Sequence, residues 1–145
     1  MKNYLLYLFL VLTVLLTNCN KKNDTASCTL SSTSIIGRYK VTSITIKNNS
    51  NAPVESINTI YAPCQQDDIH EFKATNMYSF IDAGVSCSPS NSIDVANGWS
   101  VMGNTLIYFG DAYPVTEFTC AYFKVTHVEI IGALTRVTVT TYTKQ

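Results

Sequence analysis

The sequence predicts an all-β protein, folded as a small antiparallel up-and-down barrel of about seven or eight strands. After the first 18 residues, no ten-residue stretch places apolar residues at the three-and-four spacing of an amphipathic helix. Val, Ile, Thr, Tyr and Phe dominate instead, and such β-branched and aromatic residues favour strands. Closing short antiparallel strands into a barrel also removes the exposed edges that promote aggregation.

Length and charge narrow the class of protein. The chain has 145 residues, which suits one domain and not two. It carries ten basic and ten acidic residues, or nine and ten once Lys2 is removed with the leader described next. This balance excludes a basic surface for nucleic acid, so we expect no nucleic-acid partner. The 46% of apolar residues excludes a disordered chain.

The N-terminal residues have the pattern of an export signal peptide. Lys2 is followed by 13 residues from Tyr4 to Leu16 that contain nothing more polar than Thr13. A membrane-spanning helix needs about 20 apolar residues, so this segment is too short to span. Leu16-Thr17-Asn18-Cys19 resembles the bacterial lipobox, although Asn18 stands where Gly or Ala is usual. We therefore expect residues 1–18 to be a lipoprotein signal peptide and Cys19 to be the lipid attachment site, which fixes the protein to a membrane.

Residues 19–34 are expected to form a lipidated flexible tether. The segment is rich in Ser, Thr, Asn and Lys and has no hydrophobic period. Within it, Asp24-Thr25-Ala26 resembles a bacterial O-glycosylation acceptor, and plain linker is the alternative interpretation.

The barrel domain is expected over residues 35–145. Ile35 to Lys47 reads as a strand with a bulge between Val41 and Ile44, where the alternation changes parity. Two hairpins follow: Ile69–Lys73 with Met77–Asp82, and Gly98–Met102 with Thr105–Phe109 around Gly103-Asn104, a pair suited to positive φ angles. Thr116–Val128 and Leu134–Tyr142 complete the set, joined around Gly132-Ala133. In the last strand, Val137 and Val139 share one face while Arg136, Thr138 and Thr140 share the other.

Three segments together resemble lipocalin-like domains of Gram-negative lipoproteins. Ile36-Gly37-Arg38-Tyr39-Lys40-Val41 is similar to the Gly-x-aromatic opening strand of that family. Cys64-Gln65-Gln66-Asp67-Asp68, followed by the strand that bears Phe72, is similar to its Cys-x-x-Asp-Asp segment. Asn97-Gly98-Trp99-Ser100-Val101 with Asn104-Thr105-Leu106 is similar to its Trp hairpin. The resemblance covers Ile35 to Thr143 and implies a lipocalin-like barrel.

The cysteines fit an exported protein. Besides Cys19 there are four, Cys28, Cys64, Cys87 and Cys120, and an even number in an exported chain indicates two disulfides. Their spacings contain no Cys-x-x-Cys or His-x-x-x-His pair, so we expect no metal site. The family resemblance implies the pairing, Cys64 with Cys87, which leaves Cys28 to pair with Cys120.

Thirteen aromatic residues remain after the leader, and strand alternation turns many of them toward the barrel interior. They either fill a small barrel or line a ligand pocket, and barrels of this size allow both. The candidates for lining such a pocket are Tyr39, Phe72, Tyr78, Phe80, Trp99, Leu106, Tyr108 and Phe123.

A catalytic site is not expected. Asp67, Asp68, His70 and Glu71 form the single acidic and imidazole cluster, and we interpret it as a loop entering a strand, with His70 and Phe72 on one face and Glu71 on the other. There is no Gly-x-Ser-x-Gly elbow or phosphate loop, and His127 is distant in sequence. We expect no cofactor.

Together these features predict an exported, lipid-anchored, non-catalytic binding module. The resemblance implies a small apolar or amphipathic ligand held among the inward aromatic side chains. The alternative is a solid barrel whose loops, especially Asn48–Pro63 and Ser88–Asn97, bind a protein partner of the envelope. The expected location is the bacterial cell envelope, as an outer-membrane lipoprotein facing the periplasm or the surface.

Overall fold

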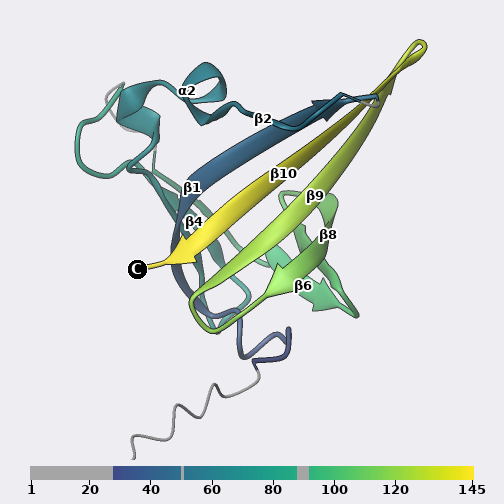
Figure 1. Ribbon diagram of the computed structural model, residues 1–145. Helices are drawn as coiled ribbons and strands as arrows, with labels where there is room; N and C mark the ends of the chain where they lie inside the picture. Colours follow the sequence, from purple (N-terminus) through teal and green to yellow (C-terminus); the bar gives the residue numbers. More distant parts are fainter. Residues whose placement is uncertain (1–27, 50, 88–91) are drawn as a thin grey trace, which may run out of the picture.

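The computed structural model describes residues 28–49, 51–87 and 92–145, which form an antiparallel, barrel-like β-sheet (Figure 1). The first five strands are β1 (Gly37–Asn48), β2 (Val54–Glu55), β3 (Ile69–Phe72), β4 (Tyr78–Ile81) and β5 (Ile93–Val95). The next five are β6 (Trp99–Met102), β7 (Thr105–Tyr108), β8 (Asp111–Phe118), β9 (Tyr122–Ile131) and β10 (Leu134–Lys144). The helices of the described residues are one short α-helix, α2 (Ile57–Ile60), and a 3-10 turn, η1 (Pro63–Gln65). The all-β class is confirmed.

The order of strands is that of an up-and-down barrel in which one strand is bent. Hydrogen-bonded neighbours run β5-β4-β3-β1-β10-β9-β8-β7-β6, with β2 added on β1. Eight antiparallel steps lead from β5 to β6, so these two strands run in the same direction. They are also consecutive in the chain, separated by residues 96–98. They therefore act as two halves of one bent strand. Because β2 is an addition to β1 and β5 and β6 count as one, the ten strands occupy eight positions around the barrel.

The bend lies at Asn97 and Gly98. Asn97 has φ of +52°, a value that Asn adopts more readily than most residues. A Cβ at Gly98 would lie 2.7 Å from the carbonyl oxygen of Val95, so only glycine fits this corner. Across the bend, the Tyr78 ring of β4 lies 5.5 Å from the Tyr108 ring of β7. The contact between these two side chains thus joins β4 to β7 across the bend, although the two strands are not hydrogen-bonded neighbours in the sheet.

The bulge and the two central hairpins follow the sequence pattern. The register of β1 against β10 shifts between Val41 and Ser43, as the change in alternation predicts. β3 pairs with β4, and β6 with β7, as expected. In the β6–β7 turn Gly103 has φ of +58°, whereas Asn104 is not among the residues with positive φ. The turn therefore needs one positive angle, where the sequence suggested two.

Two expectations about strand limits were wrong. Thr116–Val128 is divided between β8 and β9 by a turn at 119–121, in which the Thr119 hydroxyl accepts hydrogen bonds from the amides of Ala121 and Tyr122. β8 pairs with β7 through its first half and with β9 through its second. The segment expected as a loop at 88–97 contains β5, and the loop at 48–63 contains β2 and α2.

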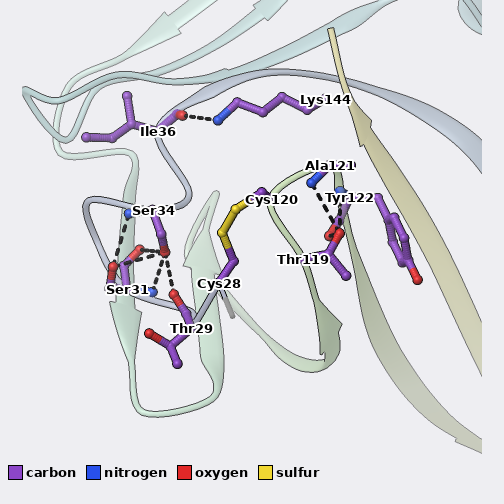
Figure 2. The surroundings of a disulfide bond; sticks show 10 residues. All are labelled: Cys28, Thr29, Ser31, Ser34, Ile36, Thr119, Cys120, Ala121, Tyr122 and Lys144. Carbon is purple, nitrogen blue, oxygen red and sulfur yellow. Dashed lines mark hydrogen bonds between the residues drawn. A yellow bond between two sulfur atoms is a disulfide. The ribbon is translucent and has the colours of Figure 1, made fainter. Parts of the chain in front are cut away.

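Both disulfides implied by the family resemblance are present. Cys64 is bonded to Cys87, and Cys28 to Cys120 in the turn between β8 and β9 (Figure 2). The composition of residues 28–34 predicted that they belong to the flexible tether, but they are part of the folded domain. Ser34 Oγ donates to the carbonyl of Thr29 at 2.7 Å, Leu30 packs on the core, and Ile35 is fully buried. The folded domain therefore includes residues 28–34 as well as the segment from Ile35 onward.

Three long strands project beyond the barrel. β1, β9 and β10 continue past the other strands as a ribbon that ends in the β9–β10 hairpin (Figure 1). Cys120 precedes the first residue of β9, and Ile131 is its last. The Cys28–Cys120 disulfide and the hairpin tip therefore lie at opposite ends of a ten-residue strand, about 33 Å apart at the usual rise.

Candidate functional site

The barrel interior brings the eight predicted side chains together. All but Phe80 are at least 93% buried, and Phe80 is partly buried against the same cluster. Phe72 lies at the centre, with its ring 5.5 to 6.1 Å from those of Tyr78, Trp99, Tyr108 and Phe123. Most of these pairs are edge-to-face, the geometry that aromatic rings prefer. The eight side chains fill the interior by contacting one another, and the core also includes Ile35, Val41, Ile44, Val125 and Tyr142.

Two buried hydrogen bonds satisfy polar groups within this core. His70 Nδ1 lies 2.6 Å from the Tyr78 hydroxyl, and the hydroxyls of Tyr108 and Tyr142 lie 2.7 Å apart. Burial lowers the pKa of His70 to about 4, so its imidazole is neutral at pH 7. Burial also raises the pKa of Tyr108 and Tyr142 above the ordinary tyrosine range. These three side chains are thus neutral at pH 7, and their hydrogen bonds satisfy polar atoms that burial would otherwise leave unpaired.

Trp99 lies at the edge of the core beside a surface cleft. Its side chain is 3% exposed, and its indole N–H donates to the carbonyls of Lys73 and Met77, both at 3.1 Å. A cleft of about 320 Å³ runs along the bend between β5 and β6. Its lining combines Val95, Trp99 and Ile107 with Asn76, Asn97, Gly98, Ser100 and Gly110. The cleft reaches one of the eight predicted lining residues and leaves the other seven in the core.

The two faces of the projecting ribbon differ in the side chains that they carry. Because Phe123 and Val125 point inward, Val128 and Ile130 point outward, and their exposed fractions are 56% and 77%. Val137 lies opposite Val128 in the β9–β10 ladder, and Val139 lies on the same face. We call Val128, Ile130, Val137 and Val139 the outer patch. The opposite face carries His127, Glu129, Arg136 and Thr138, together with Ile131, which is 52% exposed.

The sequence pattern alone does not place the outer patch at the surface. It puts Val137 and Val139 on one face without indicating which face is buried. The signal was present in Tyr142, which stacks on Phe123 inside the barrel with ring centroids 4.8 Å apart. Counting back by two from Tyr142 places Thr140, Thr138 and Arg136 on the inner side and the valines outside.

The acidic cluster organises the backbone, as the sequence suggested, but it acts on a distant loop. Asp67 Oδ2 accepts from the amide of Val85 at 3.1 Å, and Asp68 Oδ1 accepts from Ala83 at 3.3 Å. A Cβ at Gly84 would collide with Asp67, and Gly84 has φ of +66°. With Cys64–Cys87, these contacts join η1 to the loop after β4. His70 and Phe72 face inward together, and Glu71 faces Lys73 at 3.7 Å.

The described residues contain no group of three or more His, Cys, Asp or Glu side chains placed to hold a metal ion. Within the same part of the chain, no helix has the length and apolar character needed to cross a bilayer. Cys19, the signal peptide and Asp24-Thr25-Ala26 lie outside the described residues.

Comparison of the chain with protein-family models, curated proteins and solved structures finds no match. The resemblance to lipocalin-like lipoproteins therefore stays a prediction from sequence motifs.

Proposed function

We propose that this protein is a non-catalytic, lipid-anchored module of the bacterial cell envelope that binds a protein partner through the outer patch. The observation that carries the proposal is the contrast between the two candidate surfaces. Seven of the eight interior side chains are nearly inaccessible and contact one another, whereas Val128 and Ile130 are largely exposed on a projecting ribbon. Val137 and Val139 lie beside them and are partly buried. A contiguous exposed apolar surface on a folded domain typically marks an interaction site.

The position of the patch suits a partner that lies away from the membrane. The predicted lipid on Cys19 precedes the Cys28–Cys120 disulfide, which lies at the base of β9, while Ile130 lies near its far end. The barrel and ribbon thus separate the anchoring end from the patch. The arrangement places an apolar surface at the end of the molecule that is far from the predicted anchor.

The chemistry of the patch indicates the kind of surface that fits it. Its four residues are β-branched and aliphatic, and Thr126 and Thr135 flank them on the same face, opposite Val139 and Ile130 respectively. Lys47 lies opposite Val137 on β1. We therefore expect a partner surface with an apolar centre and an uncharged or acidic rim.

Site-specific photo-crosslinking tests the proposal. A photoreactive amino acid replaces Ile130 in the lipid-anchored chain in cells, and Met102 is the matched control because it is an apolar side chain 71% exposed outside the patch. We expect an adduct with one envelope protein at position 130 and not at 102. That protein, once purified, should bind the wild-type chain and lose affinity for Ile130→Lys but not for Met102→Lys.

Three outcomes would overturn the proposal. They are an equal yield at positions 102 and 130, an adduct with lipid only, and an adduct with a second copy of this chain only. Near-UV circular dichroism of both lysine variants checks that the core is intact.

Binding of a small apolar or amphipathic ligand is the second candidate, and the cleft beside Trp99 favours it. Trp99 is the one tryptophan of the chain, so its emission reports on this region alone. A filled barrel predicts that a long-chain fatty acid leaves the emission unchanged. A saturable shift that is absent in Trp99→Phe, together with a raised melting temperature, would favour the ligand-binding function instead.

A further inference from the structure

A second groove lies at the opposite end of the molecule from the Cys28–Cys120 disulfide. It is formed by the far half of β1, the segment from Asn51 to Ser56, and the start of β10, and its volume is about 420 Å³. Known small-ligand sites span about 300 to 1,000 Å³. The groove is lined by Ile46, Asn48, Asn51, Ala52, Val54, Ser56 and Arg136. None of the eight interior aromatic and aliphatic candidates contributes to it.

Two buried polar atoms in this groove are unpartnered. Arg136 Nε and Asn48 Oδ1 have no hydrogen-bond partner among the described residues and are themselves shielded from solvent, although the Arg136 side chain as a whole is 38% exposed. The two residues are direct neighbours in the β1–β10 ladder, so their side chains lie side by side. Buried polar atoms in folded proteins are nearly always paired, and an unpaired N–H on a cation is especially unfavourable. The two atoms therefore indicate a ligand group that lies between these side chains.

The surrounding charges leave Arg136 able to accept an anion. Glu129 Oε2 lies 3.5 Å from Arg136 Nη1, and Glu129 Oε1 lies 3.5 Å from His127 Nε2, so this carboxylate is shared and engages only one end of the guanidinium. Glu55, on the adjacent β2, is occupied elsewhere. It accepts hydrogen bonds from Ser43 Oγ and from the backbone amides of Ile44, Ser56 and Ile57.

The groove thus combines a donor pair with an apolar wall. The Nε–H edge of a guanidinium suits one oxygen of a carboxylate, and rotation of the Asn48 amide by 180° directs its NH₂ group at the other. Ile46, Ala52 and Val54 offer apolar surface beside these donors. We propose that this groove binds a small organic carboxylate with a short apolar chain, with Arg136 and Asn48 holding its head group. The site is independent of the protein partner proposed above.

The side-chain N–H signal of Arg136 gives a direct test. The chain contains two arginines, Arg38 and Arg136, so a ¹⁵N spectrum shows two Nε–H resonances, and Arg38→Gln assigns them. The mature chain from Cys19 onward, with both disulfides formed, is titrated with sodium hexanoate at constant ionic strength. We expect a saturable shift of the Arg136 Nε–H resonance, no shift of the Arg38 resonance, and little effect of 1-hexanol, which has a similar chain without the charge.

Three variants complete the test, with binding followed through the backbone amides of Ile46 and Ala52, which line the groove and stay unchanged in every variant. Arg136→Gln should weaken hexanoate binding at least about tenfold, because it removes the positive charge and the planar set of guanidinium N–H donors. Asn48→Leu should weaken it less, and Arg38→Gln should leave it unchanged. An Arg136 resonance unmoved by hexanoate overturns the proposal, as does an equal response to 1-hexanol. Unchanged Trp99 emission shows that each variant is folded.

Discussion

The hydroxyl groups of Tyr108 and Tyr142 lie 2.7 Å apart in the barrel interior, where they join β7 to β10. These strands are separated by β8 and β9 in the sheet, so the contact crosses the barrel rather than following a ladder. Both residues are more than 90% buried. Neither hydroxyl therefore has water to replace its partner.

Removing both hydroxyls of this pair should cost no more than removing one. Tyr108→Phe or Tyr142→Phe alone leaves a buried hydroxyl unpaired, so each should lower the free energy of unfolding by about 1–3 kcal/mol. The double variant should be no less stable than the worse single variant, because no orphaned group remains. Urea unfolding of the four proteins measures this coupling. Tyr122→Phe, which removes a surface hydroxyl bonded to Glu117, is the control. Strictly additive losses would contradict the coupling.

His70 should make stability depend on pH between about 4 and 6.5. The buried imidazole has a pKa of about 4 in the folded protein, against an ordinary value of 6.5. As pH falls below 6.5 the unfolded chain takes up a proton that the folded protein does not, so stability decreases until the pH reaches about 4. The gap corresponds to about 3 kcal/mol at 1.36 kcal/mol per pH unit.

His70→Gln tests this dependence, because glutamine does not titrate and can still bond Tyr78. The variant should lose most of the decrease in unfolding free energy over this pH window. His127→Gln is the matched control, since His127 is the other histidine and its side chain is 49% exposed. The interpretation fails if both variants show the same pH profile as the wild type.

Local sequence signals predicted those strands that are long enough to alternate. β1 has twelve residues, and its change of parity predicted the bulge that lies between Val41 and Ser43. β2 and β5 have two and three residues, too few for a period of two to show. The break between β8 and β9 was missed for another reason. Thr119 makes the turn through its own hydroxyl, yet threonine within a β-branched run reads as strand.

The interior of the candidate site was predictable, and the ribbon was not. Inside the barrel, aromatic residues such as Phe72 and Phe123 define the buried face, because no other environment accommodates them. Beyond the barrel the ribbon has no opposing wall, so neither face is forced to be buried. The alternation of Val137 and Thr138 therefore does not indicate which of the two side chains is buried. The groove at Arg136 and Asn48 depends on the pairing of β1 with β10, residues 88 positions apart, which no local pattern encodes.

The two disulfides should contribute unequally. On the chain-entropy model, Cys64–Cys87, with a sequence separation of 23, contributes about 3.5 kcal/mol, and Cys28–Cys120, with a separation of 92, about 4.7 kcal/mol. Replacing each pair with serine should therefore lower the unfolding free energy by several kcal/mol, more for the second pair. Urea unfolding measures the difference, and peptide mapping under non-reducing conditions verifies the remaining bond. Mapping that joined Cys64 to Cys120 would contradict the pairing.

The last prediction concerns the lipid anchor at Cys19. If Cys19 carries diacylglycerol and a further acyl chain, the protein should partition with membranes, because each buried methylene contributes about 0.8 kcal/mol and one chain alone gives only marginal binding. Cys19→Ala should leave an uncleaved precursor or a protein released into the soluble fraction, with both disulfides intact. The mature wild-type protein should begin at Cys19 and exceed its polypeptide mass by that of the lipid. Cys28→Ser with Cys120→Ser is the control, since it also removes thiols but should leave membrane partition unchanged. If membrane partition does not change in Cys19→Ala and the intact mass differs only by the substituted side chain, residues 1–18 are not a lipoprotein signal peptide and Cys19 does not carry the lipid.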